Sequence, residues 1–108
     1  MSDSPEVLLV YMTAPSEDVA LSLARSAVGA QLAACGNLVP GIRSVYRWKG
    51  EICDDAEFLV LFKTTPDRLD ALRMHLVEAH PYDCPEVIAT PVVAGHPAYL
   101  AWVRENVG

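Results

Sequence analysis

Residues 58–62 read Phe58-Leu59-Val60-Leu61-Phe62, a stretch that is apolar at every position. A second stretch of the same kind lies near the beginning of the chain, where residues 7–10 read Val7-Leu8-Leu9-Val10. Short apolar runs of this length are typical of strands, and successive side chains of a strand point to opposite faces of its sheet. The sheet that contains these strands is therefore predicted to be apolar on both faces.

The first predicted strand, residues 7–12, leads into a helix. Ser16 is a suitable N-cap, and Glu17 and Asp18 suit the positive N-terminal end of a helix. Apolar residues then recur at the spacing of one helical face, at Ala20, Leu23, Ala24, Ala27 and Val28. We expect this helix to run to about Ala34, with Gly36 ending it.

A long hairpin is predicted between residues 38 and 63. Pro40-Gly41 indicates a bend or bulge in its first strand, and Lys49-Gly50 indicates a tight turn into the second. Basic residues of the first strand face a returning stretch that is rich in Asp and Glu. Opposite charges favour a hairpin, although the sequence leaves the register open.

The second half of the chain completes the pattern. Thr65-Pro66 indicates a helix start, with a hydroxyl N-cap followed by proline at the first helical position, and Pro81 ends this helix. Residues 87–94 form a fourth predicted strand, in which Pro91 requires an edge or a bulge. Gly95-His96-Pro97 opens a short terminal helix that carries Tyr99, Trp102 and Val103 on one side.

This order predicts an α+β fold, a ferredoxin-like βαββαβ sandwich with an antiparallel sheet and an additional C-terminal helix. Two helices cover only one face of a four-stranded sheet, so the other apolar face is left open. Monomers rarely expose a contiguous apolar patch larger than a few hundred Å². The uncovered face is therefore predicted to meet other copies of the same chain.

Chain length and charge limit the number of domains and the kinds of partner that we expect for this protein. A chain of 108 residues is expected to form one domain, residues 1–108, with residues 1–5 as a flexible polar tail. Eight basic residues against fourteen acidic ones, a net charge of −6, argue against nucleic acid as a partner. No apolar run reaches the roughly 18 residues of a membrane helix, and no signal peptide is evident. Three cysteines without a C-x-x-C pair favour the cytoplasm.

Several short motifs, in this order, make the chain resemble the CutA family of divalent-ion tolerance proteins. They are Thr13-Ala14-Pro15, Leu32-Ala33-Ala34-Cys35, Ser44-Val45-Tyr46-Arg47-Trp48-Lys49-Gly50, Lys63-Thr64-Thr65, His80-Pro81-Tyr82-Asp83 and Tyr99-Leu100-Ala101-Trp102. The resemblance spans residues 7–103. It implies a homotrimer similar to the PII signalling proteins, a role in tolerance of divalent metals, chiefly copper, and no enzymatic reaction.

The metal candidates are His80, Cys84, Glu86 and Met12. The first three lie within seven residues, and imidazole and thiolate suit copper or zinc. In CutA relatives assigned a copper site, the ligands are a cysteine just before the Thr-Ala-Pro turn and histidines before the Pro-Tyr pair. Here Met12 stands at the cysteine position, where its thioether suits Cu(I), and Ala79 precedes His80. The alternative is a structural loop in which His80 and Tyr82 form hydrogen bonds with the backbone.

A second set of candidates, Cys35, Tyr46, Lys63 and Tyr82, is predicted to line a ligand cleft between subunits. Lys63, paired with Glu57 or Glu86, would supply charge for a small anion, as the similarity to PII proteins implies. The alternative is a solvent-exposed lysine among packing aromatics. No catalytic motif such as G-x-S-x-G or H-E-x-x-H is present. An assembly protein without any small ligand remains a third alternative.

Overall fold

The computed structural model describes residues 6–108, so the predicted tail at residues 1–5 lies outside the described residues. The elements follow in the order β1 (Leu8–Ala14), α1 (Glu17–Gly29), β2 (Cys35–Trp48), β3 (Glu51–Thr64), a 3₁₀ turn η1 (Pro66–Arg68), α2 (Leu69–Ala79), β4 (Val87–Pro91) and α3 (Pro97–Glu105). This order confirms the ferredoxin-like βαββαβ sandwich with a C-terminal helix.

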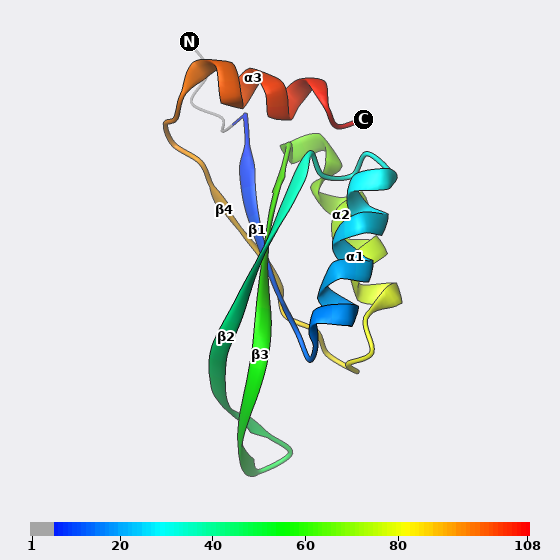
Figure 1. Cartoon of the computed structure of the whole chain (residues 1–108), viewed down its shortest axis with the longest axis vertical. Helices are drawn as coiled ribbons and strands as arrows, with labels where there is room; N and C mark the ends of the chain where they lie inside the picture. Colours follow the sequence, from blue (N-terminus) through cyan, green and yellow to red (C-terminus); the bar gives the residue numbers. More distant parts are fainter. Residues whose placement is uncertain (1–5) are drawn as a thin grey trace.

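The four strands form one antiparallel sheet in the order β2-β3-β1-β4. Helices α1 and α2 lie side by side on one face of this sheet (Figure 1). On that face Val10 pairs with Phe62 and Met12 with Val60, and none of these four side chains is accessible to solvent. Leu72 and Leu76 of α2 complete this core from the helical layer.

Within residues 6–108, no helix lies over the opposite face of the sheet (Figure 1). Its side chains alternate with the core residues along the strands, and Leu9, Leu59 and Leu61 are half-buried. Ile88 on β4 is 57% exposed. The structure thus confirms that the central strands are apolar on both faces and that the two long helices cover only one of them.

The prediction that the first helix runs to Ala34 was wrong, because α1 ends at Gly29. The chain turns at Gln31, which has a left-handed φ of 59°, and the Ala34 N–H donates to the Lys63 carbonyl of β3. Cys35 and Gly36 therefore belong to β2 rather than to a helix end. A Cβ at Gly36 would lie 3.3 Å from Phe62 Cδ1, so glycine permits close approach of this strand to the Phe62 ring.

The hairpin formed by β2 and β3 reaches well beyond the helices (Figure 1). Its register shifts between Val39 and Ile42, which confirms an irregularity at Pro40-Gly41. Lys49 and Gly50 both have positive φ, 50° and 81°, as a two-residue type I′ turn requires. Across the hairpin, Arg43 Nε lies 2.7 Å from Asp54 Oδ1, a diagonal ion pair that the sequence alone did not specify.

The remaining boundaries differ in detail from those predicted. Thr65 makes no side-chain capping bond, and α2 begins through η1 instead. Strand β4 ends at Pro91 rather than at Ala94, and its edge position explains why a proline is tolerated there. Helix α3 lies across one end of the sheet and buries Val103, whereas Tyr99 and Trp102 stay about 40% exposed. Within residues 6–108, no helix has the length and apolarity needed to span a membrane.

Candidate functional site

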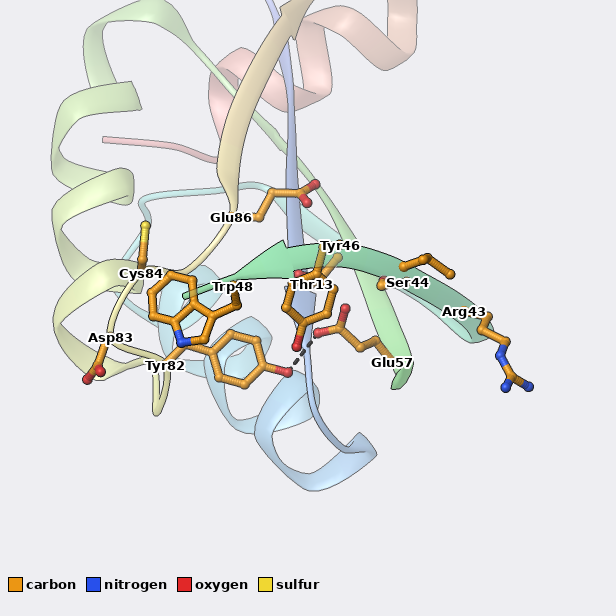
Figure 2. A pocket seen from close by; sticks show the side chains of 11 residues that line it. Thr13, Arg43, Ser44, Tyr46, Trp48, Glu57, Tyr82, Asp83, Cys84 and Glu86 are labelled. Atoms are coloured by element: carbon orange, nitrogen blue, oxygen red, sulfur yellow. Dashed lines mark hydrogen bonds between the residues drawn. The ribbon is translucent and has the colours of Figure 1, made fainter. Parts of the chain in front are cut away.

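A pocket of about 630 Å³ lies between the β2–β3 hairpin and the loop that joins α2 to β4. The hairpin contributes Tyr46, Trp48 and Glu57, and the loop contributes Tyr82, Cys84 and Glu86 (Figure 2). The hairpin residues share one face of the sheet because side chains two positions apart on a strand point the same way. Ser44 pairs with Asp55 and Tyr46 with Cys53, and these residues lie on the same face as Glu57. The pocket therefore joins segments whose nearest lining residues, Glu57 and Tyr82, are 25 residues apart in the sequence.

His80 attaches the loop to the sheet. The residue is only 7% exposed; Nε2 lies 2.8 Å from the Thr13 carbonyl oxygen, and Nδ1 lies 3.1 Å from the Tyr82 backbone nitrogen. The carbonyl can only accept and the N–H can only donate, so the imidazole is the neutral tautomer with its proton on Nε2. Both ring nitrogens are thus engaged by the backbone, which places Tyr82 over the pocket.

Replacing His80 with alanine is expected to lower the free energy of unfolding by about 2–4 kcal/mol, because the Thr13 carbonyl and the Tyr82 N–H would both lose a buried partner. Urea denaturation at one fixed protein concentration measures this change. His96→Ala is the control, since His96 is exposed and its side chain does not cap α3, and its effect should stay within about 0.5 kcal/mol. Equal stabilities for the two variants would contradict the structural role of His80.

Tyr82 and Glu57 form the inner contact of the pocket. The Tyr82 hydroxyl donates to Glu57 Oε2 at 2.7 Å (Figure 2). Burial, followed by the hydrogen bond to Glu57, raises the pKa of Tyr82 well above its usual value. The phenol therefore stays protonated and keeps donating to the carboxylate. Glu57 itself is only 6% exposed, which is rare for a carboxylate without a cationic partner.

A second tyrosine–carboxylate pair lies next to the first. The Tyr46 hydroxyl donates to Asp55 Oδ2 at 2.5 Å, and this bond raises the pKa of Tyr46 to about 12. The charge of Asp55 also contributes to the raised pKa of Tyr82, so the two pairs share one electrostatic environment. Two phenols thus donate to two carboxylates on the same face of β3.

The structure separates the four residues predicted to contact a metal. Met12 is completely buried in the core beneath the helices, and His80 uses both ring nitrogens within the fold. Cys84 and Glu86 are exposed and line the pocket. Within the described part of the chain, no three His, Cys, Asp or Glu side chains are grouped as a metal site would need.

The four residues predicted for one ligand cleft lie in two places. Cys35 and Lys63 face each other on β2 and β3, with Lys63 Nζ 4.0 Å from Cys35 Sγ and bonded to Asn37 Oδ1. The nearby Tyr99 has its pKa raised, first by burial and then by Cys35. Tyr46 and Tyr82, in contrast, line the pocket at the other part of the hairpin. Lys63 therefore contacts Asn37, not the Glu57 or Glu86 considered from sequence.

Sequence reasoning missed Glu57 as the centre of the pocket. Its partner Tyr82 is 25 residues away, and the contact depends on how the α2–β4 loop folds back over the hairpin. The available signal was the alternation of Asp55 and Glu57 with the apolar residues Ala56 and Phe58 along the predicted strand. That signal indicates carboxylates on a sheet face but not their partners.

The comparisons with known proteins agree with this fold. The family model for the CutA1 divalent ion tolerance protein matches residues 8–106. A divalent-cation tolerance protein CutA of Thermus thermophilus is 46% identical over 100 residues, which cover 93% of this chain and 97% of that protein. The solved structure of a Thermus thermophilus divalent cation tolerance protein is 45% identical with a TM-score of 0.92, and covers 94% of this chain and 99% of that one.

Other organisms carry relatives of the same kind. CutA1 from Oryza sativa has a solved structure that is 43% identical, with a TM-score of 0.92, and covers 99% of this chain and 98% of that one. The rice protein named CutA 1, chloroplastic, is 46% identical over 92% of this chain, which spans just over half of that protein's length. A periplasmic CutA of Archaeoglobus fulgidus is 32% identical with a TM-score of 0.91, covering 94% of this chain and 99% of that one. The chain belongs to the CutA1 divalent ion tolerance protein family.

Proposed function

We propose that this protein acts in tolerance of divalent cations as a homotrimer located in the cytoplasm. The uncovered sheet face supports the assembly, because Leu9, Leu59, Leu61 and Ile88 leave an apolar surface that no element of residues 6–108 covers. Family membership supports the role in cation tolerance. The family is non-enzymatic, and binding rather than catalysis is the chemistry that the pocket offers.

Copper is the proposed ion, and Cys84 and Glu86 are its proposed contacts. A thiolate and a carboxylate are both ligands for such ions, and both side chains are exposed at the pocket. His80 and Met12 do not fit this role in the folded chain, because the histidine nitrogens are engaged and the methionine is buried. One copy thus supplies two donors, and the remaining ligands would come from other copies or from water. The ion is then cargo contacted at a surface, not a structural component.

Calorimetry on the reduced protein tests this proposal with Cu(I), Cu(II) and Zn(II). The double variant Cys84→Ser, Glu86→Gln is expected to weaken copper binding at least tenfold, because both proposed donors are changed. The matched control is Cys35→Ser, Glu78→Gln, which makes the same chemical changes away from the pocket and should leave the affinity unchanged. Equal copper affinity in the wild type and the Cys84, Glu86 variant would refute these contacts.

The alternative of a PII-like sensor for a small anion has weaker support. The pocket does not include Lys63, and its ionisable lining is acidic apart from Arg43, whose guanidinium is paired with Asp54. Anion recognition at Lys63 would instead have to displace the Asn37 contact. A thermal-shift screen of carboxylates and nucleotides tests this alternative, since a ligand that binds only the folded state raises the midpoint temperature of unfolding.

A further inference from the structure

The carboxylate of Glu57 is incompletely satisfied. Its side chain is buried, only Oε2 accepts a hydrogen bond, and no Lys, Arg or His among residues 6–108 forms an ion pair with it. Oε1 is not one of the buried side-chain atoms without a partner in residues 6–108, so it is accessible from the pocket, and an ionised carboxylate can accept about four hydrogen bonds. Glu57 lines the pocket, so a donor inside the pocket can form a hydrogen bond with this free oxygen.

Aromatic rings form the walls around this carboxylate. Tyr82 and Trp48 both line the pocket, and Figure 2 shows the Tyr82 hydroxyl directed at Glu57. The Trp48 ring already has a cation near it, because Lys49 Nζ lies 5.8 Å from its centroid. Aromatic faces attract cations, and ammonium or guanidinium groups are the cations that pack against them without needing several metal-ligand bonds.

Three of the four charged residues that line the pocket are acidic. Glu57, Asp83 and Glu86 line the pocket, and the only basic residue of the lining, Arg43, points outward and makes two hydrogen bonds to Asp54, at 2.7 and 3.1 Å. The volume of about 630 Å³ is within the range of small-molecule sites. An acidic, aromatic pocket of this size fits an organic cation better than an anion.

We infer that the pocket binds a small organic cation with an N–H-bearing head group, a primary ammonium or a guanidinium. The head group donates to the free Oε1 of Glu57, and the carbon chain lies against the rings of Tyr82 and Trp48. This inference goes beyond the proposed role in cation tolerance and does not depend on copper binding at Cys84 and Glu86.

The test is calorimetry of the full-length protein with agmatine, which carries both a guanidinium and a primary ammonium. Agmatine is expected to bind, whereas 1,4-butanediol and succinate, the neutral and anionic compounds of similar length, are not. Glu57→Gln should weaken agmatine binding at least tenfold, since it removes the charge and keeps the shape. Glu78→Gln makes the same change on the exposed face of α2 and should leave the agmatine affinity within twofold of the wild type. This control separates the role of Glu57 from an effect of net charge.

A second variant keeps the test decisive if Glu57→Gln does not fold. Trp48 is 42% exposed, so Trp48→Ala is expected to fold and to weaken agmatine binding about threefold. No response at about 10 mM agmatine, or equal affinities for wild type and Glu57→Gln, would overturn the inference. A crystal of the assembled protein with a Lys or Arg of another copy seated at Glu57 would overturn it too. These outcomes are separate from the copper test, in which Glu57 is unchanged.

Discussion

Replacing Phe62 with alanine is expected to lower the free energy of unfolding by about 3–5 kcal/mol. The ring is completely buried near the C-terminal end of β3, opposite Val10 and beneath the two long helices, and it lies against Gly36 of β2. Truncation removes a large apolar side chain and leaves a cavity that the surrounding sheet can fill only partly. Urea denaturation at one fixed protein concentration measures the loss.

Phe58 provides the control for this prediction. It lies on the same strand and the same face, opposite Ala14, but is only partly buried. Phe58→Ala should therefore cost clearly less than Phe62→Ala, because less apolar surface returns to water. If the Phe62 variant lost less than about 1 kcal/mol, the assignment of this face as the core beneath the helices would be wrong.

Replacing Leu61 with lysine is expected to dissociate the proposed trimer into single chains. Leu61 directly precedes Phe62 on β3, so its side chain points to the uncovered face, where it is half-buried in one copy. An unpaired ammonium buried between copies costs several kcal/mol, and a symmetric trimer would carry three of them. Sedimentation at micromolar concentration should show the mass of three chains for the wild type and of one chain for the variant.

Leu21→Lys is the matched control, since Leu21 lies on the outer face of α1 and is 39% exposed. It introduces the same side chain on the covered side of the molecule and should leave the trimer intact. Circular dichroism of the Leu61 variant should retain the wild-type secondary structure, because the core beneath the helices is unchanged. A Leu61→Lys protein that sediments like the wild type would show that the uncovered face is not the interface.

The fold was accessible from the sequence because its signals are local. The run Phe58–Phe62, the Lys49-Gly50 turn and the Pro91 edge position each indicate their element without knowledge of distant residues. The end of α1 was not accessible, because alanine is compatible with continued helix. A tertiary hydrogen bond from Ala34 to Lys63 and the packing of Gly36 against Phe62 draw those residues into the sheet instead.

In the candidate site, too, the sequence indicated individual residues, whereas the tertiary contacts decided which of them lie together. Sequence reasoning named Tyr46, Tyr82, Cys84 and Glu86, and all four line the pocket. It also grouped Cys35 and Lys63 with the two tyrosines, although these lie with Asn37 elsewhere on the sheet. Residue type suggests which chemistry a side chain can perform, but distance along the chain does not say which side chains meet.

The sequence by itself determined the βαββαβ order, the two apolar faces of the central strands and the family. Each of these follows from periodicity, turn residues or ordered motifs, which depend on neighbours along the chain. Only the tertiary structure decided that His80 is an internal connection between the loop and β1, and that Glu57 lies buried beneath Tyr82. Burial and hydrogen-bond partners are properties of residues brought together from distant segments, so they exist only once the sheet and its loop have folded against each other.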